Sequence, residues 1–138
     1  MQSYRLVLAL TNNGMAAVAE IVTFANVKGG SGKSTLCVNI ASMLAKLNRS
    51  VCVIDADPQQ STLDWIKNTN DPVLSLVDCN DVDILGEVSQ RGYDFVLIDT
   101  QGSLNKELAG FLKISSLILV PCRISRDDIV GQGWIQMF

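Results

Sequence analysis

The fold is decided by the stretch "NVKGGSGKSTL", Asn26 to Leu36. The run that leads into it, "EIVTFAN" (20–26), is rich in residues that favour β-strands. After the glycines, apolar side chains recur at the spacing of one helical face, at Leu36, Ile40, Leu44 and Leu47. The sequence therefore predicts a strand, a glycine-rich loop and a helix in direct succession.

The rest of the chain continues this alternation of short apolar runs and helical segments. Further strands are predicted at 50–57, 73–78, 93–100 and 115–122, and further helices at 61–69, 81–92 and 105–114. This pattern indicates βαβ units, and the continuous apolar strands indicate a sheet covered on both faces. The predicted fold class is α/β, a parallel sheet flanked by helices. Residues 1–14 are expected to be an extension outside the domain, which then comprises residues 15–138.

Composition limits the chemistry available to the chain. Its 138 residues, net charge of −3 and 48% hydrophobic content are typical of one globular domain without a basic footprint for nucleic acid. The absence of histidine excludes Ser-His-Asp triads and histidine zinc sites. The apolar run Leu6–Leu10 is too short for a secretory signal, and no membrane association is expected. The cysteines are interpreted as small buried residues in a reducing, cytoplasmic compartment: Cys37, Cys52, Cys79 and Cys122.

The glycine-rich loop is predicted to bind phosphate. Glycines permit positive φ angles, so backbone N–H groups can close around phosphate oxygens, and the helix that follows adds its positive dipole end. Lys33 is expected to reach the β- and γ-phosphates, and Ser34 to supply a hydroxyl to Mg²⁺. The alternative, a glycine-rich turn with an exposed lysine, is disfavoured by the strand-to-helix context. The predicted phosphate-binding residues are Gly29, Gly30, Ser31, Gly32, Lys33, Ser34 and Thr35.

Acidic residues follow two of the predicted strands. Asp55 and Asp57 stand at the end of the strand "SVCVIDAD" (50–57), where ligands bind in parallel sheets. Taken alone, this pair is also compatible with an ordinary Asp-Pro turn. Asp99 ends the apolar run of "YDFVLIDT" (93–100) and is expected to hold Mg²⁺ through water. Taken alone, an apolar core strand that ends in a capping aspartate would show the same sequence pattern. Gly102 is expected to let the backbone approach the γ-phosphate.

Three motifs together resemble those of the ParA/MinD family of ATPases. "KGGSGKST" (28–35) is similar to the deviant Walker A motif of that family, "DADPQ" (55–59) to its switch I, and "FVLIDT" (95–100) to its Walker B motif. The resemblance implies a P-loop NTPase that binds ATP and Mg²⁺. It implies that Lys28 acts on nucleotide bound by a second copy, that Asp57 orients the attacking water, and that Asp55 helps to hold Mg²⁺. Gln101 departs from the family, in which proline or alanine is common at that position.

The resemblance is closest to ParA-type partition ATPases. It implies a homodimer formed on ATP, non-specific DNA binding, a stimulating partner protein and a role in plasmid or chromosome segregation. A MinD-like membrane ATPase is disfavoured because "IVGQGWIQMF" (129–138) is a poor surface helix. An electron carrier with an iron–sulfur cluster is disfavoured because Cys79 and Cys122 are not placed to flank a dimer axis.

The resemblance also implies that the domain is incomplete at its C-terminal side. Residues 116–120 are then expected to form a strand that lacks its next neighbour. ATP hydrolysis is expected only if the domain is complete enough to dimerise. The alternative function is a nucleotide-binding remnant without ATPase activity, which would interfere with full-length homologues.

Overall fold

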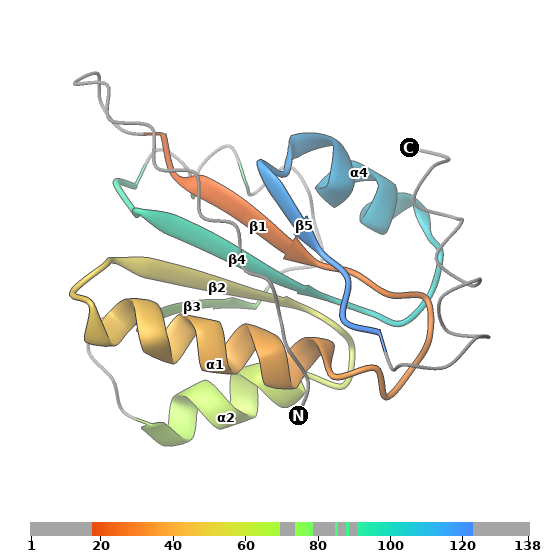
Figure 1. Cartoon of the computed structure of the whole chain (residues 1–138), viewed down its shortest axis with the longest axis horizontal. Helices are drawn as coiled ribbons and strands as arrows, with labels where there is room; N and C mark the ends of the chain where they lie inside the picture. Colours follow the sequence, from red (N-terminus) through yellow and green to blue (C-terminus); the bar gives the residue numbers. More distant parts are fainter. Residues whose placement is uncertain (1–17, 70–73, 79–84, 86–87, 89–90, 123–138) are drawn as a thin grey trace.

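The structure is a computed structural model, and it describes residues 18–69, 74–78, 85, 88 and 91–122. Its centre is a five-stranded sheet in the order β3-β2-β4-β1-β5, and every neighbouring pair is parallel (Figure 1). The strands are β1 (Glu20–Phe24), β2 (Val51–Ala56), β3 (Leu74–Asp78), β4 (Phe95–Thr100) and β5 (Leu117–Leu119). The predicted fold class, a parallel α/β sheet flanked by helices, is therefore confirmed.

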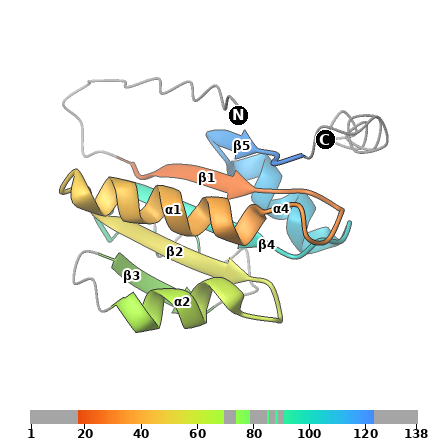
Figure 2. The same ribbon diagram turned by 60° about the horizontal axis from the view of Figure 1, so that its bottom comes forward.

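Helices cover both faces of this sheet. They are α1 (Lys33–Lys46), α2 (Ser61–Thr69) and α4 (Lys106–Ile114). Figure 2 shows α1 and α2 in front of the sheet and α4 behind it. Residues 85 and 88, which are helical and buried, pack on the same face as α4. The rest of the helix predicted at 81–92 lies largely outside the described residues.

The core has two halves because successive strand residues point to opposite faces. In β2, Val51 and Val53 pack against α1 and α2, whereas Cys52 and Ile54 pack against Phe111 of α4. Both sets are almost fully buried. This two-sided burial explains why the strands are continuously apolar rather than alternating.

The packed face of α1 differs from the sequence prediction. Periodicity placed Leu47 on the buried face, but its side chain is 69% exposed. The helix contacts the sheet through small residues at i, i+4 and i+8, namely Cys37, Ala41 and Ala45, while the leucines and Ile40 flank this line. Small side chains let the helix backbone approach the sheet closely. A prediction based on the positions of large apolar side chains therefore missed the residues that make this contact.

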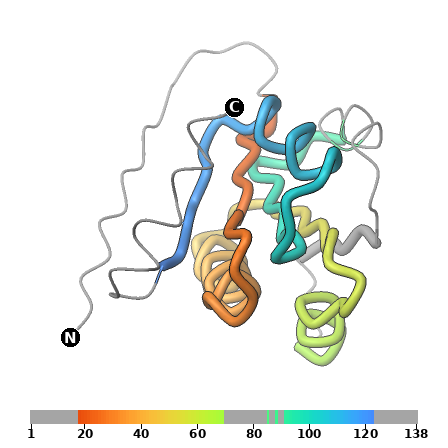
Figure 3. Tube along the Cα trace, turned by 90° about the vertical axis from the view of Figure 1, so that its right-hand side faces the viewer, coloured from red at the N-terminus to blue at the C-terminus, as the bar shows by residue number. Residues whose placement is uncertain are grey.

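Strand order determines where the loops meet. The connection from β1 through α1 reaches β2, and β4 lies between these two strands. Figure 3 shows the trace of β1 running between those of β4 and β5. The carboxyl ends of β1, β4 and β2 are therefore neighbours, and ligands bind at this edge in open parallel sheets.

Strand β5 is at the edge of the described sheet and pairs with β1 alone. The strand expected at residues 116–120 is thus present over Leu117–Leu119, and its lack of a further neighbour stays a prediction. The described residues do not include the predicted extension (1–14) or the residues that follow Cys122 (123–138).

The cysteine prediction is correct for two residues and wrong for a third. Cys37 and Cys52 are buried, but Cys122, which follows the end of β5, is exposed. Cys79 lies outside the described residues. Among the helices that the structure describes, none combines the length and apolarity needed to cross a membrane.

Candidate functional site

A cavity of about 630 Å³ opens at the carboxyl edge of the sheet. The loop before α1 forms one wall, and the segments that follow β2 and β4 form the others. All seven residues from Gly29 to Thr35 that were predicted to bind phosphate are brought together here. The lining residues are Gly29, Gly30, Ser31, Gly32, Lys33, Ser34, Thr35, Asp57, Pro58, Gln59, Ser61, Gln101 and Gly102.

Two glycines shape the loop. Gly30 has a φ of 68° and Gly32 a φ of 93°, values that side-chain-bearing residues rarely adopt. Gly32 is also the N-cap of α1 and offers no side chain to cap the helix. The first N–H groups of a 14-residue helix are therefore directed at the cavity without a side-chain acceptor from the N-cap, as in helix-terminal anion sites.

Lys33 is the cation of this cavity and is only 6% exposed. Burial lowers the pKa of its ammonium group, and the negative charges of Asp99 and Asp57 oppose that shift. An anionic ligand in the cavity would add to these charges and favour the protonated form. Lys33 lines the cavity beside the glycine-rich loop, and its contact with phosphate stays a prediction.

Asp99 is fully buried near the end of β4. Its Oδ2 accepts a hydrogen bond of 2.6 Å from the hydroxyl of Thr62, whereas its Oδ1 has no partner within the described part of the chain. Burial raises the pKa of Asp99, and the nearby hydroxyls of Thr62 and Ser34 act against that rise. The predicted pair of Ser34 and Asp99 is thus brought together.

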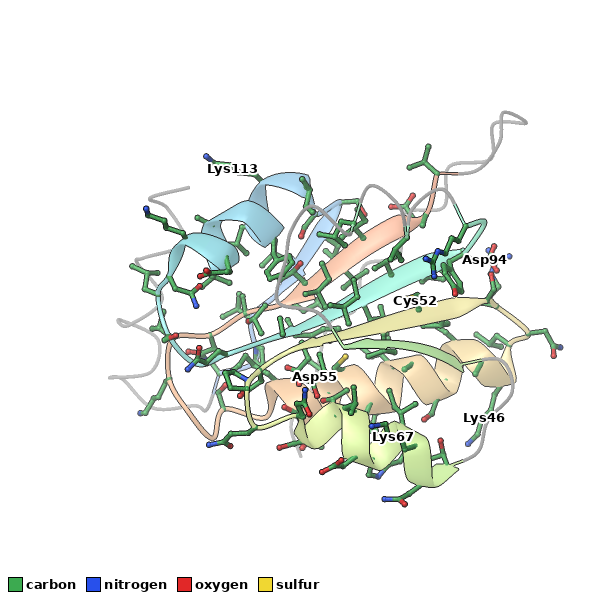
Figure 4. All side chains as sticks on the ribbon, turned by 180° about the vertical axis from the view of Figure 1, so that it is seen from behind. Lys46, Cys52, Asp55, Lys67, Asp94 and Lys113 are labelled. Atoms are coloured by element: carbon green, nitrogen blue, oxygen red, sulfur yellow. The ribbon has the colours of Figure 1, made fainter. Side chains whose placement is uncertain are left out.

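Asp55 lies opposite Asp99 in the β2–β4 register and is equally buried. Figure 4 places it beside the start of α2. Its Oδ2 accepts from the backbone N–H of Leu63 at 2.8 Å, and its Oδ1 from that of Asp57 at 3.1 Å. Burial raises the pKa of Asp55, and these backbone bonds lower it. Asp55 therefore fixes the segment from Asp57 to α2, a structural role that the sequence did not predict.

Asp57 itself lies on the cavity wall. It is half-buried, and its Oδ1 accepts from the backbone N–H of Gln59 at 2.9 Å. The carboxylate is thus held by its own loop and remains accessible to a molecule in the cavity.

Gly102 brings the segment after β4 against the phosphate loop. A Cβ atom at this position would lie 3.2 Å from the backbone nitrogen of Gly29 and 3.3 Å from its Cα. Both neighbours are backbone atoms, so they cannot move as easily as a side chain. A side chain here would force the Gly29 backbone to shift by a few tenths of an ångström, and the role of Gly102 toward the γ-phosphate stays a prediction.

Lys28 is exposed and lies outside the cavity lining. Its backbone N–H donates to Oδ1 of the buried Asn26 at 2.8 Å. The Asn26 amide donates in turn to the carbonyl of Pro121 at 2.7 Å, next to β5. Sequence analysis missed Asn26 and Thr62. A polar residue that ends an apolar strand was a signal for Asn26, whereas nothing in the sequence marked Thr62.

The side chains at and around the cavity offer donors for Mg²⁺ and for a phosphate ligand. No cluster of three or more acidic or thiol side chains suited to a metal occurs in residues 18–69, 74–78, 85, 88 and 91–122. Mg²⁺ commonly uses one or two carboxylates, with phosphates and waters completing its shell. Oδ1 of Asp99 and Oγ of Ser31 are buried without a partner in the same residues, as expected of groups that await a ligand. The residues present therefore fit both groups.

Comparison with known proteins identifies the family. Residues 22–120 match the CobQ/CobB/MinD/ParA nucleotide binding domain. The ParA protein of Rhizobium radiobacter is 29% identical over 122 residues, which cover 85% of this chain and 55% of that protein. The maintenance of carboxysome distribution protein A of Halothiobacillus neapolitanus is 35% identical over 118 residues, which cover 80% and 54%.

A solved structure supports the same fold. The putative plasmid partition protein of Borrelia burgdorferi bound to AMPPNP superposes with a TM-score of 0.71 at 23% identity, covering 86% of this chain and 67% of that one. The chain spans about half the length of the curated relatives it matches. The loop, the carboxylates and the match over residues 22–120 agree, and the chain belongs to the CobQ/CobB/MinD/ParA nucleotide-binding domain family.

Proposed function

We propose that this chain is the ATP-binding domain of a ParA-type partition ATPase, which dimerises on ATP and takes part in plasmid or chromosome segregation. The observation that carries the proposal is the cavity itself, where an uncapped helix start, a buried lysine and the buried Oγ of Ser31 converge. Asp99, whose Oδ1 likewise has no partner in the described residues, is buried near Ser34 and Lys33 of this lining. The names of the ParA relative and of the AMPPNP-bound partition protein support the choice of function and of nucleotide.

Within this proposal, the loop from Gly29 to Thr35 binds the phosphates through its N–H groups, and Lys33 neutralises the β- and γ-phosphates. Ser34 and Asp99 hold Mg²⁺, and Asp55 helps to hold the ion and its waters while it anchors the segment from Asp57 to α2. Mg²⁺, when bound, supplies positive charge at the phosphate oxygens. Asp57, accessible on the cavity wall, orients the attacking water, and Gly102 gives the γ-phosphate a close backbone contact.

Lys28 serves a second copy of the chain in this proposal. Its exposure beside the cavity, rather than within the lining, supports action across an interface. A cation supplied there would stabilise the charge that builds up during phosphoryl transfer. DNA binding, a stimulating partner protein and a cytoplasmic location are part of the same proposal and rest on the partition relatives.

A second candidate function is a nucleotide-binding remnant that does not hydrolyse ATP. The edge position of β5 within the described sheet favours it, because an unpaired strand offers an interface to another chain. Such a chain would bind nucleotide and pair with full-length homologues, and it would show no turnover of its own.

The direct test is calorimetric titration of the full chain with ATP and Mg²⁺. We expect saturable binding to the wild type and a loss of about tenfold or more in affinity for Lys33→Ala, since a charge-assisted hydrogen bond contributes about 1.5–3 kcal/mol. Lys46→Ala, in the last turn of the same helix, is the matched control and should bind like the wild type. No binding to correctly folded wild-type protein would refute the proposal.

Two further measurements distinguish the role of Lys28 from that of Lys33. One is ATP-dependent dimerisation, monitored by light scattering, and the other is the rate of ATP turnover. Lys28→Ala should bind ATP like the wild type but lose turnover. A wild type that binds ATP without any turnover or dimer would favour the remnant instead.

A further inference from the structure

Asp99 is held from one side only. The hydroxyl of Thr62 lies 2.6 Å from Oδ2, and both residues are fully buried. The other oxygen, Oδ1, is equally buried and has no hydrogen-bond partner in the described chain. A carboxylate fixed at one oxygen has its second oxygen set in one direction, which is the arrangement of a ligand oriented by an outer partner.

The first turn of α2 contacts both buried carboxylates. Thr62 donates its hydroxyl to Asp99 of β4, and the next residue, Leu63, donates its N–H to Asp55 of β2. These two aspartates are direct neighbours in the β2–β4 register. One helical turn therefore sets the orientation of two acidic side chains on adjacent strands.

The same turn is continuous with the cavity wall. Asp57, Pro58, Gln59 and Ser61 line the cavity immediately before Thr62. The N–H of Asp64 donates to the carbonyl of Gln60, which ties this wall to the start of α2. A ligand that moves the wall would therefore act on the hydrogen bond to Asp99.

We infer that Thr62 is a positioning residue for Asp99, which aims the free carboxylate oxygen at the divalent cation that accompanies the nucleotide. This inference rests on the proposed nucleotide-binding function. Thr62 does not touch the nucleotide; it acts through Asp99. Mutating the outer hydrogen-bond partner of a metal ligand commonly weakens metal affinity by about 10–100-fold, so the expected effect is measurable.

The test measures Mg²⁺ affinity at a fixed concentration of a non-hydrolysable ATP analogue, by calorimetry on the full chain. Thr62→Val keeps the shape of the side chain but removes the hydroxyl, and it should weaken Mg²⁺ affinity by about tenfold or more. Thr62→Ser keeps the hydroxyl and should restore the wild-type value. Affinity for the analogue in EDTA should be the same in all three proteins.

Thr23→Val is the matched control for structural damage. Thr23 is also fully buried, and its hydroxyl forms a 2.6 Å hydrogen bond, but with Ser115 and not with a carboxylate. We expect this control to lower the melting temperature while leaving Mg²⁺ affinity unchanged. If Thr62→Val does not fold, Thr62→Ala replaces it in the same comparison with Thr62→Ser.

The outcomes distinguish a failure of the proposed nucleotide-binding function from a failure of the role proposed for Thr62. Wild-type protein that binds no nucleotide would overturn the proposed function. Wild-type protein that binds nucleotide with Mg²⁺, together with a folded Thr62→Val or Thr62→Ala variant of equal Mg²⁺ affinity, would overturn the role of Thr62 alone. Loss of affinity that Thr62→Ser fails to restore would also count against it.

Discussion

The negative charge of Asp99 is a stability problem for the nucleotide-free chain. Its side chain is fully buried, with one oxygen lacking a hydrogen-bond partner in the described residues. Burial raises the pKa above the ordinary value of 3.8, so the native state retains the proton to a higher pH than the unfolded state does. The free energy of unfolding therefore falls as the pH rises from about 3.8 through the native pKa, and the loss persists at pH 7.

Asp99→Asn should remove this loss. We expect a higher melting temperature at pH 7 without nucleotide, by more than the roughly 0.5 kcal/mol typical of surface changes, and a flatter pH dependence in the acidic range. The same variant should lose the effect of Mg²⁺ on nucleotide affinity. Thermal unfolding at several pH values provides the measurement, and Asp64→Asn, on the exposed side of α2, provides the control. An equal or lower melting temperature at pH 7 would contradict the argument.

Single residues also mark the limits of what the sequence predicted. Lys33, Asp57, Asp99 and Gly102 could be placed near one edge of the sheet because each belongs to a motif next to a predicted strand, whereas their functional roles stay predictions. The carboxylate of Asp55 was found for the same reason, but its bonds to two backbone N–H groups depend on how the chain turns into α2. Such a contact between a strand and a later helix has no sequence signature.

At the scale of elements, the segment after β4 rests directly on the phosphate loop. A methyl group at Gly102 would crowd the backbone of Gly29, which would have to shift by a few tenths of an ångström. These two segments come from different strands, so their contact fixes the distance across the cavity mouth.

Gly102→Ala should push the two segments apart. We expect weaker nucleotide binding, by about tenfold or more if one charge-assisted phosphate contact is lost, with a smaller change in melting temperature. Calorimetry and thermal unfolding measure the two effects. Gly29→Ala, whose added Cβ would meet no atom within 4 Å, serves as the comparison for stability. Unchanged nucleotide affinity in Gly102→Ala would show that the contact is dispensable.

Elements differ in how well their sequences predicted them. Strands β2 and β4 were predicted within one or two residues of their ends because they are apolar on both faces, a pattern that follows from their central position. Helix α1 was predicted from its periodicity, but its buried face was predicted wrongly at Leu47. The helix contacts the sheet along Cys37, Ala41 and Ala45. These positions are in contact because their small side chains let the helix backbone come close to the sheet, and not because they are the most hydrophobic.

At the scale of the whole molecule, the two faces of the sheet protect their thiols to the same degree. Cys37 of α1 packs against one face of the sheet, Cys52 of β2 points to the opposite face, and both are buried. Burial raises the pKa of Cys52 to about 11 and that of Cys37 well above its ordinary value. Cys122 is exposed.

Alkylation with iodoacetamide at pH 7.5, followed by peptide mapping, should modify Cys122 well before Cys37 and Cys52. The thiolate is the reacting form, and burial both excludes the reagent and suppresses ionisation. In urea, all three should react at similar rates, which controls for intrinsic reactivity. Native-state labelling of Cys37 as fast as that of Cys122 would contradict the described packing.

The parallel direction of the strands also gives the molecule two unlike ends. Asp55 lies at the end that bears the cavity, whereas Lys46 and Asp94 lie at the other (Figure 4). There, Asp94 is bonded to Ser50 and Arg49, which closes the turn after α1. A fluorophore or surface tether attached through Lys46 would therefore face away from the nucleotide. The chain could be immobilised by this end for single-molecule measurements while its phosphate-binding edge stays open to solution.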